Sequence, residues 1–434
     1  MRCWASLLIV GTIATTVAAE PAEFRVDARH SGTFDAAGVP VLHGLKWRFA
    51  AGGPIVSTPV VQDGAIYFGS NDKRLYALDD RTGALRWKYE TQGRVSASPA
   101  VAGGRVYFGS YDGNFYALDA ATGTLAWKFA TEGERRFSAR NLHGMDPAAE
   151  TMPDPFDVFL SSPVITGETV YFGSGDGNVY ALAAASGALR WKFRTGGVVH
   201  ASPAIANGVV YVGSWDTYLY ALDAASGKMR WKFKTGDDAK IHNQEGIQSS
   251  AVVADGIVYF GCRDSHLYAL DAASGAKRWS VSTGDSWIVS SPAVRDGVVY
   301  FATSDSGLIE AVDSKNGALR FSLDFKHWPF FSSPTLAGNL LYIGSNAGQV
   351  LAIDLTTRKV AWTFQTDAAK NNGPAYTKAD GSPNVEVAFK DFFYDDVIIG
   401  TDRMRSVGAV MSTPIANVNA LFIGSWDGHM YAVN

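Results

Sequence analysis

The sequence predicts an all-β fold, and within that class an eight-bladed β-propeller of four-stranded antiparallel blades. A unit of about 40 residues recurs along the chain, as between Pro59 and Pro99, and this is the repeat length of propeller blades. The 45 Gly and 12% aromatic residues are typical of strands joined by tight turns. The last unit stops at Asn434 without its final strand, whose pattern occurs instead at residues 45–49. We therefore expect both termini to complete the last blade together, which removes the exposed edges of an open array.

The residues before the repeats have the features of an export signal. An apolar run from about residue 4 to residue 17 follows a basic residue, and small residues precede Glu20. The run is too short to span a bilayer, so we predict a secretory signal peptide over residues 1–19. Residues 20–43 then lead into one propeller over residues 44–434. The expected location is the periplasm or the exterior of the cell.

The two cysteines limit the covalent chemistry of the chain. Cys3 lies ahead of the apolar run and not at the cleavage site, so we do not expect a lipid anchor. The mature chain keeps Cys262 alone, which excludes an internal disulfide. Cys262 replaces a Ser of the repeat, and we expect a small buried residue rather than a nucleophile.

A clear copy of the unit, at residues 97–129, predicts the elements of a blade in order. Turn-forming Asp, Gly and Asn residues separate short runs rich in Val, Tyr, Phe and Leu, the pattern of strands joined by tight turns. The expected strands are 97–101, 106–110, 115–118 and 124–129. In the third turn, as at Asp79–Gly83, local hydrogen bonding explains the Asp better than metal binding does.

An aromatic residue marks the fourth strand of every blade. A large ring there can fill the wedge between neighbouring sheets, so we expect a structural role. The tryptophans are Trp47, Trp87, Trp127, Trp191, Trp231, Trp279 and Trp362, and Phe321 replaces Trp in the sixth blade.

Three connections are longer than the repeat allows, at residues 131–160, 235–248 and 366–410. Each joins the fourth strand of one blade to the first strand of the next. Turns alternate between the two faces of an antiparallel blade, so all three insertions should share one face and overhang the channel mouth, where ligands commonly bind. Long surface loops that are merely tolerated are the alternative.

The candidate ligand-binding residues lie in these insertions and beside the channel. They combine charges, amides, imidazoles and an aromatic ring, unlike the content of a plain linker. They are Glu134, Arg135, Arg136, His143, Asp154, Asp157, His200, His242, Asn243, Gln244, Gln248, Arg263, Asp264, Trp287, Asp391, Asp395 and Arg403. His200 and His242 are metal candidates, but no HExxH or CxxC spacing supports them, and no single residue is identified as catalytic. Trp215 and Trp426 occupy equivalent turns of blades four and eight, where packing is more usual than ligand stacking.

The charge of the chain bears on its partners. The formal net charge is −4 and no long Lys/Arg block occurs, so we expect no nucleic acid to bind. No apolar stretch is long enough for a membrane span.

The repeat resembles a known one. Residues 116–123, YALDAATG, followed by WKF at residues 127–129, are similar to the pyrroloquinoline quinone (PQQ) propeller repeat, and the resemblance covers nearly the whole mature chain. It implies the propeller fold and leaves activity open, because several families share it. Some are quinoprotein dehydrogenases, with PQQ and Ca²⁺ at the channel mouth; another is the propeller subunit of the outer-membrane β-barrel assembly machinery, a binding scaffold.

The chain departs from both relatives. It lacks the Cys-Cys pair and the CxxCH haem motif of quinoprotein alcohol dehydrogenases, and it carries Glu20 where the assembly subunit has a lipidated Cys. We therefore expect a soluble exported propeller that binds a protein partner or small ligand on its loop-rich channel face, without chemistry of its own. The alternative is a PQQ- and Ca²⁺-dependent dehydrogenase, with Arg135, Arg136 or Arg403 holding the quinone carboxylates and a separate electron acceptor.

Overall fold

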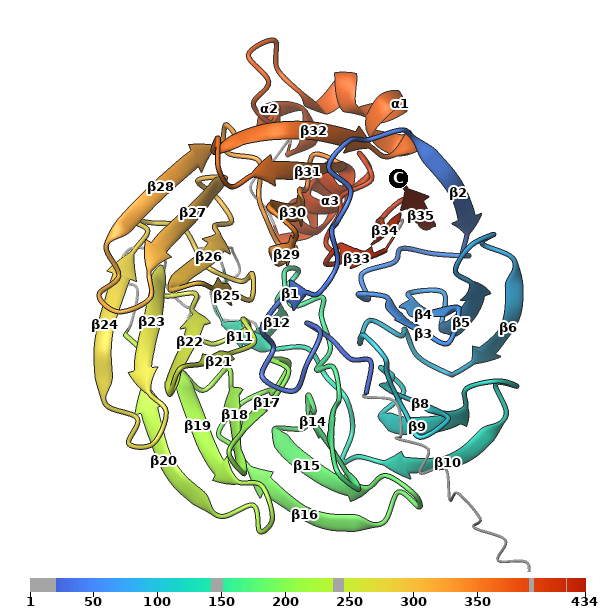
Figure 1. Ribbon diagram of the computed structural model, residues 1–434, viewed down its shortest axis with the longest axis vertical. Coiled ribbons are helices and arrows are strands. Elements are labelled where there is room, and N and C mark those ends of the chain that lie inside the picture. Colours follow the sequence, from blue (N-terminus) through green and yellow to red (C-terminus); the bar gives the residue numbers. More distant parts are fainter. Residues whose placement is uncertain (1–20, 141, 143–150, 237–245, 390–393, 419) are drawn as a thin grey trace, which may run out of the picture.

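The structure is a computed structural model that describes residues 21–140, 142, 151–236, 246–389, 394–418 and 420–434. Eight sheets, each with four antiparallel strands, form a closed ring (Figure 1). This confirms the predicted fold class.

Each blade follows the same strand order from the channel to the rim. Blade one comprises β3 (Val60–Gln62), β4 (Ala65–Ser70), β5 (Arg74–Asp79) and β6 (Leu85–Glu90), and blade two comprises β7 (Ala100–Ala102), β8 (Arg105–Gly109), β9 (Asn114–Asp119) and β10 (Leu125–Ala130). Blade three comprises β13 (Val164–Thr166), β14 (Thr169–Gly173), β15 (Asn178–Ala183) and β16 (Leu189–Arg194). Blade four comprises β17 (Ala204–Ala206), β18 (Val209–Gly213), β19 (Tyr218–Asp223) and β20 (Met229–Lys234). Blade five comprises β21 (Val252–Ala254), β22 (Ile257–Gly261), β23 (His266–Asp271) and β24 (Lys277–Ser282); blade six, β25 (Ala293–Arg295), β26 (Val298–Ala302), β27 (Leu308–Asp313) and β28 (Leu319–Asp324); blade seven, β29 (Thr335–Ala337), β30 (Leu340–Gly344), β31 (Gln349–Asp354) and β32 (Lys359–Gln365).

The eighth blade closes the ring with strands from both ends of the chain. It consists of β33 (Ile415–Asn417), β34 (Ala420–Gly424), β35 (His429–Val433) and β2 (Leu45–Ala50). β2 pairs antiparallel with β35, so that Trp47 lies opposite Ala432, and Figure 1 shows these two strands side by side. The predicted closure is confirmed.

Six of the fourth-strand tryptophans join their blade to the next, whereas Trp362 donates to Val39 O of the segment before β2. Trp191 Nε1 donates to Ala224 O of the following blade at 2.9 Å, and Trp47 donates to Asp80 O at 3.1 Å. The turn glycines allow this packing: Gly227 has φ +70°, and a Cβ on it would lie 2.7 Å from the Trp191 ring. These glycines therefore serve both the turn and the close approach of the ring.

A belt of hydroxyl groups links the inner edges of all eight blades. The residue before each first-strand proline, or its counterpart, accepts a hydrogen bond from the corresponding amide of the preceding blade, as between Ser162 N and Ser202 Oγ at 2.9 Å. The circuit ends where Thr413 N donates to Thr58 Oγ1 at 3.0 Å. The first strands begin later than predicted, at Ala100 instead of Ala97 in blade two, because the residues before them pair with neighbouring blades and not within the sheet.

The segment before β2 plugs the channel. It runs through the centre of the ring (Figure 1), and its short strand β1 (Thr33–Phe34) pairs parallel with β29. Arg25 is 1% exposed and donates to Pro334 O at 2.6 Å and to Pro292 O. Ala28 O accepts from Ile205 N of blade four at 2.5 Å. The segment thus satisfies inner-strand groups that would otherwise lack partners.

The third insertion contains helices that the sequence analysis did not predict. They are α1 (Asp367–Tyr376), α2 (Val385–Ala388) and α3 (Tyr394–Arg405), between β32 and β33. α1 includes Gly373 and Pro374, which weaken the helical signal, although Thr366 caps it by accepting from Ala369 N at 3.1 Å. In the described ranges, no helix has both the length and the apolar character needed to cross a membrane.

Candidate functional site

The insertions meet the second turns of the blades at one end of the channel; we call this end the insertion face. Glu134 Oε1 of the first insertion accepts from Gly175 N at 2.6 Å. Gly236 N of the second donates to Asp264 Oδ2 at 2.8 Å, and Thr366 N of the third donates to Gly348 O at 2.9 Å. Because these partners all lie in turns between second and third strands, the described parts of the insertions occupy a common face.

The first insertion crosses the channel axis and closes it. Its hairpin pairs β11 (Ser138–Arg140) with β12 (Thr151–Pro153), and the chain then turns inward. Val158 belongs to a buried cluster with Trp287, Phe331 and other channel-lining side chains, and Phe156 packs against that cluster. The channel mouth is therefore filled with apolar side chains of the chain itself.

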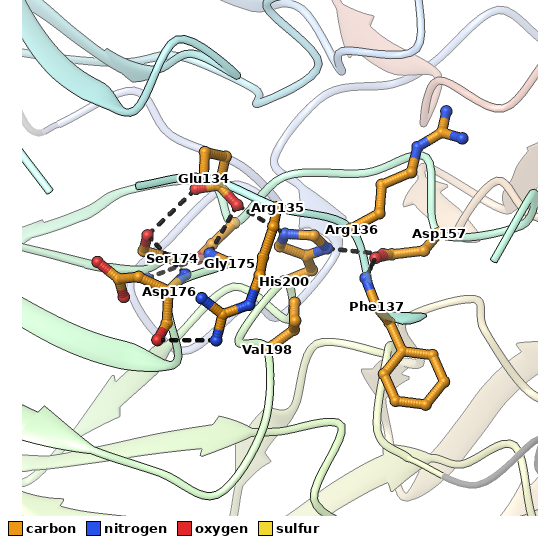
Figure 2. A network of polar contacts seen from close by, with 12 residues as sticks. Glu134, Arg135, Arg136, Phe137, Asp157, Ser174, Gly175, Asp176, Val198 and His200 are labelled. Atoms are coloured by element: carbon orange, nitrogen blue, oxygen red, sulfur yellow. Dashed lines mark hydrogen bonds and ion pairs between the residues drawn. The ribbon is translucent and has the colours of Figure 1, made fainter. Parts of the chain in front are cut away.

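A buried histidine lies between two carboxylates, beside the apolar side chains that fill the channel mouth (Figure 2). His200 Nδ1 lies 2.6 Å from Asp157 Oδ1, and His200 Nε2 lies 2.9 Å from Glu134 Oε1. The other Asp157 oxygen accepts from Phe137 N at 2.6 Å. The His200 side chain is 0% exposed. The first insertion is thus tied to the first-strand region of blade four.

The surroundings of His200 determine its protonation. Burial by itself would lower the pKa of the imidazole, but the charge of Asp157 and the hydrogen bonds to Asp157 and Glu134 outweigh burial and raise the pKa to about 10. At neutral pH the ring is therefore an imidazolium that donates from both nitrogens. Its position between the two carboxylates is that of a structural cation.

A second buried cation lies between two indole rings. The Arg263 guanidinium carbon is 4.3 Å from the Trp215 ring centroid and 4.4 Å from that of Trp287. Arg263 Nη1 donates to Asp154 Oδ2 at 2.5 Å, and Nε and Nη2 donate to Gln248 Oε1 at 3.1 and 2.8 Å. The side chains of Arg263 and Asp154 are both 0% exposed. Such a desolvated, bidentate arrangement favours Arg over Lys.

A third buried cation, Arg405, has a different environment. It is 4% exposed, and its guanidinium carbon lies 4.8 Å from the Trp426 ring centroid. Its Nη2 donates to Pro155 O at 3.0 Å, and Asp402 Oδ1 lies 3.7 Å from its Nη1 on the exposed side. Burial lowers the pKa of Arg405 to about 10, so the side chain stays cationic at neutral pH.

The structure brings seven of the predicted site residues into one region: Glu134, Asp154, Asp157, His200, Gln248, Arg263 and Trp287. The other described candidates have partners of their own or point elsewhere. Arg135 Nη2 donates to Asp176 O at 3.3 Å, whereas the Arg136 guanidinium points away from His200 (Figure 2). Asp264 accepts from Tyr268 Oη at 2.6 Å within its own blade, and Arg403 Nη1 donates to Ala388 O at 2.9 Å.

Some predictions fall outside what the structure describes. His143, His242, Asn243, Gln244 and Asp391 lie outside the described residues, and so does the Asp395 side chain, although its backbone belongs to α3. In the described part of the chain, no group of three or more His, Cys, Asp or Glu residues is arranged to hold a metal ion.

Cys262 is fully buried. Its Sγ lies 3.4 Å from Gly246 O, and burial raises the pKa of the thiol well above its usual value. These surroundings suit a small packed residue and oppose thiolate formation.

Several residues of the site were not among those predicted from the sequence. Phe156 plugs the channel, Phe137 stacks on Trp215 with 4.3 Å between ring centroids, and Arg405 replaces Arg403 as the inward-facing arginine. The spacing of Thr401 and Arg405, four positions apart on one helix face, would have indicated Arg405 once α3 was recognised.

Known proteins resemble the chain in repeat and fold. Residues 43–152, 144–363 and 263–413 match the family described as outer membrane protein assembly factor BamB. A comparison with curated proteins finds no match.

Solved structures share the architecture. BamB from Moraxella catarrhalis superposes with a TM-score of 0.65 at 16% identity, covering 91% of this chain and all of its own. A europium-containing methanol dehydrogenase gives 0.66 at 14% identity, covering 94% of this chain and 91% of its own. The quinohemoprotein alcohol dehydrogenase from Comamonas testosteroni gives 0.68 at 16% identity, covering 95% and 80%. At these identities the likeness shows the fold alone. The family match spans most of the sequence, so the chain belongs to the PQQ-repeat propeller family described as outer membrane protein assembly factor BamB.

Proposed function

We propose that this chain is an exported propeller that binds a protein partner or small ligand at its insertion face and performs no chemistry of its own. One observation carries the proposal: three described carboxylates at the channel mouth are each paired with a cation of the chain itself, around apolar side chains that fill the mouth. Asp157 and Glu134 both bind His200, and Asp154 binds Arg263. The site is therefore built as a rigid surface.

The same residues do not fit PQQ with Ca²⁺ on the channel axis. A divalent cation bound to Asp154 or Asp157 would lie beside a buried guanidinium or imidazolium, and like charges repel strongly where water is excluded. A planar quinone would also need a free aromatic face, but Trp215 has Phe137 stacked on it and Arg263 beside its ring. Phe156 packs against Trp287 and Phe331 in the same region, with ring centroids 5.8 and 6.1 Å away.

The dehydrogenase is the competing function, because two of the superposed folds are named as alcohol or methanol dehydrogenases. Titration of the purified chain with PQQ and Ca²⁺, followed by quinone absorbance and by dye reduction with alcohols, separates the two functions. We expect neither saturable binding nor turnover. Saturable binding together with turnover that Asp157→Asn abolishes would overturn the proposal.

Partner binding has its own test. A photo-crosslinking residue placed at Val385 of the insertion face, which is 48% exposed, should form a discrete adduct in an extract of the source cells, whereas one at Leu319, 61% exposed at the start of β28, should not. Equal labelling from both positions would contradict binding at the insertion face. For export, the N-terminal sequence of the protein recovered outside the cytoplasm should begin at Glu20.

A further inference from the structure

A cavity of about 420 Å³ lies on the insertion face, between α2 and α3 and the turns of blades six and seven. Its walls are mainly apolar, and they include Phe156, Trp287, Trp328, Phe331, Phe389 and Met404. The volume falls within the ~300–1,000 Å³ range of small-molecule pockets, and a few convergent polar groups in an apolar wall are typical of such pockets.

Three residues that line this cavity contain a buried polar atom without a partner. Arg405 Nε, Thr401 Oγ1 and Asn346 Oδ1 are buried and have no hydrogen-bond partner among the residues that the structure describes. Arg405 and Thr401 are each 4% exposed. A buried polar atom without a partner is costly, so native proteins usually satisfy it with protein, water or ligand. Two side chains with an unused donor and one with an unused acceptor therefore lie around one apolar space.

The charge of the cavity favours an anion. Arg263 shows how this fold satisfies a buried guanidinium, with a carboxylate at 2.5 Å and an amide oxygen. The carboxylates that act on Arg405 are Asp154 and Asp402, and Asp402, whose side chain is 60% exposed, lies 3.7 Å from Arg405 Nη1. Lys378 and His327 also line the cavity, and the opposing carboxylate, Asp305, accepts from Ser304 Oγ at 2.7 Å. The described ion pair of Arg405 is thus longer than the 2.5 Å contact that Arg263 makes with Asp154.

We propose that this cavity binds a small monocarboxylate with an aromatic or apolar body. The carboxylate pairs with the Arg405 guanidinium beside Thr401, and the body lies against Trp287, Trp328 and Phe389. A charge-assisted bond to a buried guanidinium is among the stronger hydrogen bonds in proteins, and the aromatic walls exclude water around it. This inference rests on the proposed function, because it names the ligand class that the insertion face recognises.

The first test compares two probes of nearly the same shape. Naphthalene-2-carboxylate and its neutral carboxamide are titrated into the full mature chain by calorimetry. We expect the carboxylate to bind at least tenfold more tightly, because the amide brings no charge to Arg405. Equal affinity, or no carboxylate binding up to the solubility limit, would overturn the inference.

Variants locate the site. Arg405→Gln should weaken carboxylate binding at least tenfold and leave carboxamide binding nearly unchanged. Val385→Trp should block the cavity, since Val385 lines it and is 48% exposed; Val387→Trp is the matched control, because Val387 lies on the same helix, is 45% exposed and does not line the cavity. If Arg405→Gln fails to fold, the tryptophan pair decides. Equal binding by both tryptophan variants would refute the site.

The outcomes remain separable from those of the proposed function. If naphthalene-2-carboxylate does not bind and PQQ gives no turnover, the ligand class is wrong and the non-catalytic function stands. If PQQ with Ca²⁺ supports turnover while the carboxylate still binds under Arg405 control, the cavity stands and the non-catalytic function falls.

Discussion

Removing the positive charge of Arg263 should destabilise the protein far more than removing a surface arginine. Arg263→Met leaves the Asp154 carboxylate buried without its cation, and Gln248 Oε1 loses both of its donors. Breaking a buried ion pair costs about 3–5 kcal/mol, and an amide oxygen left without donors adds ~1 kcal/mol or more. We expect the free energy of unfolding to fall by about 4–6 kcal/mol.

A double-mutant cycle isolates the charge pairing. Asp154→Asn removes the carboxylate charge and keeps the oxygen that accepts from Phe156 N at 2.7 Å. Since either single change removes the ion-pair partner of the other charge, the double variant should be less destabilised than the sum of the singles, by ~2–3 kcal/mol.

The exposed pair Arg230–Asp223 is the matched control. Its atoms are 2.7 Å apart, but the side chains are 46% and 31% exposed, so Arg230→Met with Asp223→Asn should give a coupling below ~1 kcal/mol. Urea denaturation followed by tryptophan fluorescence measures all the variants. A coupling for Arg263 and Asp154 no larger than that of the control would refute the reasoning.

Three further predictions concern His200, a turn glycine and the closing strand. The NMR titration of His200 should have its midpoint near pH 10, and Asp157→Asn should lower that midpoint. Because the pKa of His200 in the folded protein lies above the ordinary 6.5, the ion pairs of His200 stabilise the fold fully below about pH 6.5, and this stabilisation is lost as the pH rises towards 10. A midpoint near pH 6.5 would contradict the ion pairing. Gly227→Ala should cost ~1–3 kcal/mol more than Gly208→Ala in urea denaturation, since both have φ near +70° but only the first added Cβ meets an indole; equal costs would remove the steric argument. Trp47→Ala should lower the free energy of unfolding by ~3–5 kcal/mol, because Trp47 is 8% exposed where β2 closes the ring; a change under ~1 kcal/mol would mean that this contact contributes little.

The architecture of the ring was accessible from local chemistry. Turn residues such as Asp223 and Gly227 form their hydrogen bonds within a few positions, as between Ser226 N and Asp223 Oδ1 at 3.0 Å. The sequence pattern of a turn therefore predicts its structure. The helices of the third insertion were not accessible in this way, because tertiary packing and a cap at Thr366 stabilise a segment of weak propensity.

The candidate site could be placed on a face but not assembled. Glu134, Asp157 and His200 were all expected near the channel, yet their pairing depends on how the first insertion folds over it. Arg405 and Arg403 look alike in the sequence, and the rotation of α3 sends Arg405 inward while Arg403 binds the backbone of α2. Side chains two positions apart on a helix point in directions that differ by more than half a turn, and the composition of the segment does not predict which of them points inward.

The sequence by itself determined the number of blades, their four strands and the closure of the ring by both termini, because these follow from a periodic pattern of short-range turns and packing. Only the tertiary structure decided which charges meet. Asp154 and Arg263 are 109 positions apart, and Arg405 and Pro155 are 250 apart. Such contacts form when ring closure brings the turns of distant blades to one channel mouth, and the order of residues along a loop does not encode the distances across it.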